Sequence, residues 1–384
     1  DQEKKVLESI MPCRFVIYDS PLVKEEVTNL IFQQTDFKRF SPLIFSRFEM
    51  FRFLEEFELV MWIDTDVMIQ GNISDLLSEA RKVGFAIYRE DPENKSAFNV
   101  DYALTNFNYP IDGYNMKEYL LCSGLIIVSR ALEQKKDYTE WLNNKAIELL
   151  RKRALKMLDQ GTINLLVQEF NIPILPIGNG GKYGCWPYPG RDCSNAVIVH
   201  AWGPNKFWND WYLYCTFPKW EYYHQKWIAM GGEPLYSEFK PSVSVLIPAY
   251  KPDIGYLREC IDSILQQKQN DNFYTFSNVQ IIIVAEPLNK EEIQVAIDQY
   301  NDPRLTLIFN KERMGISYSL NVGLKNAKAE YIARIDTDDI ADPQRLIKQY
   351  QYLEQNPDIS MCVSNYEYFG DMNEGRVIFE GEMS

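Results

Sequence analysis

The chain has 384 residues, of which 46% are hydrophobic and 24% are charged, a composition typical of a globular protein with two or three domains. Its formal net charge of −14 excludes the broad basic face that a general nucleic-acid-binding protein needs. A phosphorylated ligand remains compatible with this charge, because a bound divalent cation supplies positive charge locally.

The first half of the chain alternates short apolar runs with longer helical patterns. The apolar runs predict strands because they are short and rich in β-branched residues. In chain order we expect a helix at 21–34, strands at 59–64, 83–88 and 123–129, helices at 131–156 and 160–170, and a strand at 196–200. This alternation predicts an α/β domain.

The second half shows the same alternation more regularly. Strands are expected at 243–248, 279–286, 304–309 and 331–336, and helices at 256–268, 291–300 and 316–328. Continuous apolar strands between helices predict βαβ units and a parallel sheet covered on both faces.

Residues 230–242 contain two Gly and two Pro and mark the boundary between the halves. We therefore expect one domain at 1–232, a linker at 233–241 and a second domain at 242–384. Both domains are predicted to be Rossmann-like, each with a mainly parallel sheet flanked by helices.

The tetrapeptide Ile-Asp-Thr-Asp occurs at 63–66 and again at 335–338, each time where a predicted strand ends. Residues i and i+2 of an extended chain point the same way, so Asp64 and Asp66 can present two carboxylates together, as can Asp336 and Asp338. In open α/β sheets, ligands bind at the carboxyl ends of the strands. Two carboxylates there suit Mg²⁺ or Mn²⁺, which also accepts substrate phosphates. Two metal–nucleotide sites are therefore predicted.

The first of these sites has further support in the segment "VIVHAWGPNKFW" at 197–208. His200 ends a predicted strand and can complete a metal shell begun by the two aspartates; the alternative is a packed core histidine. Gly203 permits a phosphate to approach the backbone closely, and Lys206 supplies a point charge for it.

Four segments of residues 1–230 together resemble glycosyltransferase family 8, the retaining sugar-nucleotide transferases of the GT-A fold. They are "RFEMFRFLEEFELVMWIDTDVMIQGNISDL", "LCSGLIIVS", "DQGTINLL" and "HAWGPNKFW". The resemblance implies that Arg47 contacts the sugar donor and that Asp159 and Gln160 lie beside the transferring carbon. Cys122 replaces the family's usual Asn near the sugar. Gly161 stands where an acidic residue often follows, which favours same-face substitution over a covalent intermediate.

Residues 241–384 resemble the nucleotide-binding half of glycosyltransferase family 2, the inverting GT-A enzymes, through "VSVLIPAYKPDIGYLRECIDSILQQ" and "ERMGISYSLNVGLKNAKAEYIARIDTDDIADPQRL". The implied roles are nucleotide contact for Pro248 and Tyr250, ribose contact for Asp336 and metal binding for Asp338, with Arg334 and Asp339 in support. The family's Asp-Asp-Gly-Ser is replaced by "AEPL" at 285–288, where Glu286 would offer a carboxylate to the uracil. The family's general base lies further downstream, so this domain is expected to be incomplete and inactive alone.

The stretch "FWNDWYLYCTFPKWEYYHQKW" at 207–227 concentrates aromatic residues. One interpretation is an acceptor platform or a peripheral membrane contact, since Trp and Tyr favour interfaces. The other is an aromatic cap on the core of the first domain, with His224 part of that packing.

The cysteines, seven in number and without a Cys-x-x-Cys pair, predict reduced thiols, although Cys185 and Cys193 flank a loop and could pair. No apolar run approaches the ~18 residues of a membrane-spanning helix, and no signal peptide opens the chain. We expect a cytoplasmic location, with the inner face of the membrane as an alternative. Because the chain begins without Met and stops within a pattern, we also expect a fragment.

The resemblances imply a metal-dependent hexosyltransferase that uses Mn²⁺ or Mg²⁺ and a UDP-sugar, with galactose or glucose as the sugar. The acceptor would be a glycan, glycolipid or glycoprotein, as in bacterial surface polysaccharide biosynthesis. The first domain would retain and the second would invert the anomeric configuration. The alternatives are a UDP-sugar-binding scaffold with one inactive domain and a nucleotidyltransferase.

Overall fold

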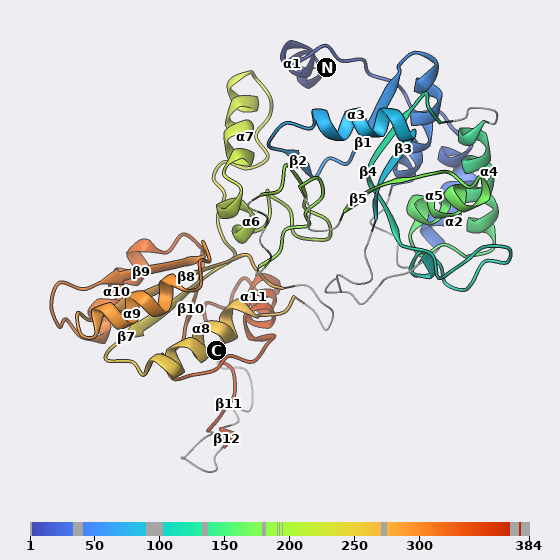
Figure 1. Ribbon diagram of the computed structural model, residues 1–384. Helices are drawn as coiled ribbons and strands as arrows, with labels where there is room; N and C mark the ends of the chain where they lie inside the picture. The colour runs from blue at the N-terminus through green and yellow to red at the C-terminus, as the bar shows by residue number, and fades with distance from the viewer. Residues whose placement is uncertain are drawn as a thin grey trace. The chain divides into compact units, whose positions relative to one another are not determined.

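The computed structural model describes residues 2–33, 41–89, 103–132, 137–178, 182–189, 191, 193, 195–269, 275–368 and 376–377 (Figure 1). The chain divides into two compact units, one of Asp1–Pro187 with Arg191–Trp202 and one of Tyr188–Gly190 with Gly203–Ser384. Each unit combines a sheet with helices, which confirms the predicted α/β class.

The first unit carries the more irregular set of elements. In chain order they are α1 (Gln2–Ile10), η1 (Pro21–Val23), α2 (Glu25–Gln33), η3 (Pro42–Glu55), β1 (Leu59–Ile63), β2 (Val67–Ile69), α3 (Ser74–Val83), β3 (Phe85–Arg89), η4 (Ala103–Asn106), β4 (Leu121–Ser129), α4 (Tyr138–Arg151), α5 (Leu158–Glu169), β5 (Leu175–Gly178) and β6 (Ile198–His200). The predicted strands and helices are present; the strands β2 and β5 and the helices α1, η3, α3 and η4 are additional. The helix expected at 131–156 begins only at Tyr138, where the Asp137 side chain accepts a hydrogen bond from the Glu140 N–H.

The main sheet of this unit has the strand order β1-β4-β3-β5. Strand β4 is antiparallel to both β1 and β3, whereas β3 and β5 are parallel. Three of the four strands therefore run the same way, in keeping with the expected mainly parallel sheet, and β4 is reversed between them. Ile126 and Val128 of β4 join one core cluster and Leu125 and Ile127 join another. A strand buried on both faces is a continuous apolar run in either direction, so its pattern does not reveal its direction.

The second unit is more regular. Its elements are α6 (Trp211–Thr216), α7 (Lys219–Ala229), β7 (Val243–Ala249), α8 (Ile254–Leu265), β8 (Val279–Ala285), α9 (Lys290–Asp298), β9 (Leu305–Phe309), α10 (Ile316–Asn326), β10 (Tyr331–Arg334), α11 (Arg345–Gln355), β11 (Tyr366–Glu367) and β12 (Arg376–Val377). The order β10-β7-β8-β9 is parallel throughout. This confirms the predicted parallel sheet, and its central strands β7 and β8 are almost wholly buried.

The aromatic stretch at 207–227 lies in the second compact unit, which takes up the chain again at Gly203, whereas the sequence placed the linker at 233–241. Polar contacts as well as apolar ones attach this stretch to the rest of the second unit. The backbone N–H of Trp211 donates to Asn278 Oδ1 (3.0 Å), and Ser277 Oγ donates to the buried carboxylate of Asp210. The guanidinium of Arg304 lies 5.4 Å from the Tyr212 ring centroid. Because these partners are distant in sequence, composition alone did not show them.

Cys185 and Cys193 form a disulfide, which corrects the expectation of reduced thiols at these positions. Cys185 lies beside β6, where its N–H donates to Ile198 O (3.1 Å) and its carbonyl accepts from His200 N (2.9 Å). The loop returns alongside it, so the two Cα atoms are 6.0 Å apart, within the range that a disulfide spans.

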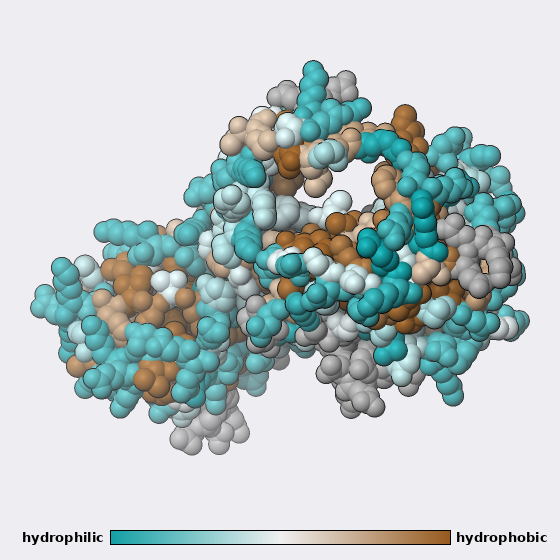
Figure 2. Space-filling view, turned by 45° about the horizontal axis from the view of Figure 1, so that its top comes forward, coloured by the Kyte–Doolittle hydropathy of each residue, from teal (hydrophilic) through white to brown (hydrophobic). Residues whose placement is uncertain are grey.

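The surface is mainly polar in the view of Figure 2, with apolar residues gathered in patches that polar ones surround. Within the aromatic stretch, Phe207, Trp211 and Phe217 are buried, whereas Tyr222 and Tyr223 are exposed. Within the part of the chain that the structure describes, no helix is both long and apolar enough to cross a bilayer.

Candidate metal centre

The end of β1 and the end of β6 bring three metal-ligand side chains together. Asp64 follows β1, Asp66 precedes β2, and His200 ends β6, which pairs with β2 so that Val67 lies opposite His200. The Ala201 N–H donates to the carbonyl of Asp66 (2.9 Å), and this hydrogen bond holds the end of β6 beside the start of β2. One ligand atom each from Asp64, Asp66 and His200 lies within 4.8 Å of the others. The structure thus assembles the three residues that the sequence singled out in the first half.

These residues fit a divalent cation. The donors are two carboxylates and an imidazole, a set that divalent first-row metals accept. Gly124 of β4 lies against them: a Cβ there would be 2.1 Å from His200 Cε1 and 3.1 Å from Asp64 Oδ2. The space beside the ligands therefore depends on the absence of a side chain at Gly124, the last residue of the "CSG" segment at 122–124.

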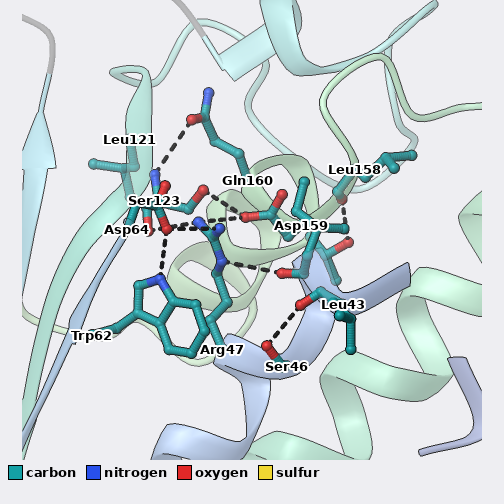
Figure 3. A network of polar contacts seen from close by, with 12 residues as sticks. Leu43, Ser46, Arg47, Trp62, Asp64, Leu121, Ser123, Leu158, Asp159 and Gln160 are labelled. Carbon is teal, nitrogen blue, oxygen red and sulfur yellow. Dashed lines mark hydrogen bonds and ion pairs between the residues drawn. The ribbon is translucent and has the colours of Figure 1, made fainter. Parts of the chain in front are cut away.

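Arg47 joins this group to a second carboxylate deeper in the unit (Figure 3). The guanidinium donates from Nη2 to Asp64 Oδ1 (3.0 Å) and from Nη1 to Ser123 O (2.7 Å), and Nη1 lies 2.9 Å from Asp159 Oδ2. The Arg47 side chain is only 7% exposed. It comes from η3, where Ser41 accepts the Leu43 N–H at the first turn and the phenylalanines Phe45 and Phe48 anchor the segment in the core.

Asp159 and Gln160 belong to the same buried network, at the start of α5. Ser123 Oγ donates to Asp159 Oδ2, and Gln160 Oε1 accepts the Ser123 N–H (3.3 Å). The Gln160 amide donates from Nε2 to Asn106 Oδ1 (2.8 Å). Ser123 and Asn106 were not among the site residues predicted from the sequence. Ser123 precedes the glycine of a strand already singled out, whereas nothing in the sequence marks Asn106.

The packing around residue 161 explains why this position is a glycine. A Cβ at Gly161 would lie 2.9 Å from Leu155 Cδ2 and 3.2 Å from Phe107 Cε1. An acidic side chain does not fit there without displacing these neighbours.

Burial raises the pKa of the Asp64 carboxyl above its usual value, and the Arg47 guanidinium and the Trp62 indole N–H oppose that rise. The Trp62 Nε1 donates to Asp64 Oδ1 (2.8 Å). This contact was also missed from sequence, although Trp62 stands two residues before Asp64 and therefore on the same side of β1.

Gly203 and Lys206 lie in the second unit, so the unit that holds the three ligands does not itself contain them. Gly203 has φ = 91°, a conformation that favours glycine. The Lys206 N–H donates to Asn209 Oδ1 (2.6 Å), and Asn205 Nδ2 donates to Ser277 Oγ (2.9 Å). The loop is thereby fixed to the second unit.

The second Ile-Asp-Thr-Asp lies at the end of β10 in a different environment. Arg334 Nη2 donates to both oxygens of Asp336 (2.7 and 2.9 Å), and Asp338 is exposed. Burial and the neighbouring Asp336 raise the pKa of Asp339. Among the described residues, Asp64, Asp66 and His200 are the only group of three acidic, histidine or cysteine side chains close enough to share an ion.

The remaining predicted nucleotide contacts lie at the ends of β7 and β8. Pro248 is in β7, and the exposed Tyr250 ring lies 4.7 Å from the Arg313 guanidinium. Glu286 follows β8 and is buried; its oxygens accept the N–H groups of Met314 (3.0 Å) and Gly315 (2.8 Å). Its carboxylate therefore holds the loop that precedes α10.

Two family models match this chain. The Glycosyl transferase family 8 model matches residues 5–212, and the Glycosyl transferase family 2 model matches residues 244–379.

Curated proteins that are similar to parts of this chain are also named glycosyltransferases. A glycosyltransferase of Methanocaldococcus jannaschii is 37% identical over 142 residues, 37% of this chain and 46% of that protein. The glycosyltransferase GlyG of Streptococcus pneumoniae is 31% identical over 36% of this chain and 42% of its own length. The bifunctional glycosyltransferase pgtA of Dictyostelium discoideum is 35% identical over 32% of this chain and 17% of its own. The chain spans less than half the length of these relatives.

Among solved structures, the mannosyltransferase PcManGT from Pyrobaculum calidifontis, in complex with GDP-Man and Mn²⁺, has a TM-score of 0.26 and 21% identity over 35% of this chain and 39% of that one. TarS 1-349 of S. aureus in complex with UDP-GlcNAc has a TM-score of 0.27 and 20% identity over 30% and 32% of the two chains.

Proposed function

The chain belongs to glycosyl transferase family 8, and from this membership we propose that its first unit transfers a hexose, galactose or glucose, from a UDP-sugar to a glycan, glycolipid or glycoprotein acceptor with retention of configuration. The observation that carries the proposal is the convergence of Asp64, Asp66 and His200 beside the buried Arg47–Asp159 ion pair. A protein that used these carboxylates only for packing would not need a cluster of three metal ligands next to a buried ion pair.

The proposed roles follow from the contacts. Asp64, Asp66 and His200 would hold Mn²⁺ or Mg²⁺, which when bound neutralises negative charge on the departing diphosphate. Arg47 orients Asp64 and Asp159 at once, because its guanidinium reaches both. Asp159 and Gln160 are proposed to position the sugar. Phosphate contact by Lys206 is proposed from the family resemblance alone. The packing around Gly161 leaves no room for a carboxylate nucleophile there, which supports same-face substitution.

The second unit is proposed to be the nucleotide-binding half of an inverting, family 2-like transferase, with Asp336, Asp338, Pro248 and Tyr250 around a nucleotide. A second candidate for this unit is a non-catalytic nucleotide-binding scaffold. It is favoured by the Arg334 bridge to both oxygens of Asp336 and by the engagement of Glu286 with backbone N–H groups. Synthesis of a bacterial surface glycan is the setting we propose for the whole protein.

The test is UDP release from a panel of UDP-sugars with Mn²⁺, using the full-length natural protein. Asp66→Ala is expected to lower release from the first unit's donor by about a thousandfold, since metal stabilisation of the leaving group is worth several kcal/mol. Asp75→Ala on α3 is the matched control, because Asp75 is an exposed aspartate outside the site. Release that is unaffected by Asp66→Ala would overturn the proposal. Release from a second sugar that is lost only in Asp338→Ala would exclude the scaffold.

A further inference from the structure

We propose that Trp62 is a positioning residue for the metal, which sets the oxygen of Asp64 that faces the cation; this inference rests on the metal-dependent function proposed for the first unit. Trp62 belongs to β1 and Asp64 follows it by two residues, so both side chains leave the strand on one side. Figure 3 shows the indole below Asp64, with its N–H directed at the carboxylate.

Two donors converge on a single oxygen of that carboxylate. Trp62 Nε1 donates to Asp64 Oδ1 at 2.8 Å, and Arg47 Nη2 donates to the same Oδ1 at 3.0 Å. The other oxygen, Oδ2, lies toward His200, because the position of a Cβ on Gly124 would touch both Asp64 Oδ2 and the His200 ring. Oδ1 is therefore committed to the protein and Oδ2 is presented to the ion.

The indole is suited to this task because it also stabilises the second donor. The Arg47 guanidinium lies 5.2 Å from the centroid of the Trp62 ring, within cation–π distance. The ring packs against the apolar core of the first unit, which restricts its rotation. One rigid side chain thus holds the carboxylate directly and through Arg47. Groups that orient metal ligands in this way typically change metal affinity by about 10–100-fold when they are removed.

The second Ile-Asp-Thr-Asp shows what a different residue does at the same place. Arg334 stands two residues before Asp336 and donates to both of its oxygens, so neither oxygen is singled out for an ion. A neutral donor with a single N–H, as in Trp62, occupies one oxygen only.

The test is Mn²⁺ binding to the full-length protein without nucleotide, measured by calorimetry and by Mn²⁺ quenching of tryptophan fluorescence. Trp62→Phe keeps an aromatic ring but removes the N–H, and about tenfold weaker Mn²⁺ binding is expected. Much of the Mn²⁺-dependent quenching is also expected to disappear, because Trp62 touches a ligand. Trp141→Phe, on α4 of the same unit, is the control and is expected to keep both the Mn²⁺ affinity and the Mn²⁺-dependent quenching.

A resonance measurement covers the case in which Trp62→Phe does not fold. In protein carrying ¹⁵N-tryptophan, the Trp62 indole N–H resonance is expected to broaden at substoichiometric Mn²⁺, along with those of Trp202 and Trp186, which lie beside His200. Failure of wild type to bind Mn²⁺ would contradict the metal function itself. Normal Mn²⁺ affinity in a folded Trp62→Phe protein, or a Trp62 indole resonance that stays sharp while Mn²⁺ binds, would overturn only the role of Trp62.

Discussion

The same four residues, Ile-Asp-Thr-Asp, end a strand in each unit, yet the two copies have different surroundings. In the first copy, His200 arrives from β6 and Arg47 from η3, and both contact the aspartates. In the second copy, Arg334 of the same strand binds Asp336, and no third ligand joins within the described residues. The motif supplies a pair of carboxylates; the segments that the fold brings beside it make a metal site.

The two arginines provide the largest expected contrast between the copies. Arg47→Ala removes a buried guanidinium from Asp64 and Asp159, and loss of one partner of a buried ion pair costs about 3–5 kcal/mol in the free energy of unfolding. Arg334→Ala removes an exposed partner, for which about 0–1 kcal/mol is expected. Scanning calorimetry, which resolves separate transitions, would measure both. Equal effects would mean that the two copies do not differ in burial as described.

The glycine beside the ligands gives the next largest effect. Gly124→Ala would force the His200 ring to move, because the new Cβ would lie 2.1 Å from its Cε1. We expect about 10–100-fold weaker Mn²⁺ binding, as for other changes that displace a metal ligand. Gly178→Ala, in the same unit, is the control, since a Cβ there meets nothing within 4 Å. Calorimetric titration would measure both variants, and unchanged binding by Gly124→Ala would remove His200 from the ligand set.

A smaller effect is expected where the aromatic stretch joins the second unit. Ser277→Ala removes the hydroxyl that donates to buried Asp210 and accepts from Asn205. An unsatisfied buried acceptor costs about 1–3 kcal/mol. Denaturant unfolding would measure the loss, with Ser317→Ala, an exposed serine at the start of α10, as the control. If the two variants were equally stable, the aromatic stretch would not depend on this attachment.

The sequence predicted most elements and the three metal-ligand candidates, because those depend on local patterns. The reversed direction of β4 was not predicted, since an apolar run buried on both faces looks the same in either direction. The attachment of Asp210 to Ser277 and of Trp211 to Asn278 was not predicted either, because it depends on side chains far apart in the chain. Trp62 was missed for a different reason: its spacing from Asp64 was visible, but an indole N–H directed at a carboxylate is a matter of side-chain orientation.

The smallest expected effect belongs to the second copy. Asp338→Ala is expected to leave Mn²⁺ titration without nucleotide unchanged, because Asp338 is exposed and Asp336 is occupied by Arg334. Mg²⁺ and similar ions held by one or two carboxylates depend on substrate phosphates for the rest of their shell. With UDP present, therefore, the same variant is expected to lose a second Mn²⁺ that wild type gains. A second tight Mn²⁺ in wild type without UDP, absent from Asp338→Ala, would show that the second copy is a metal site in its own right and would end the contrast between the two.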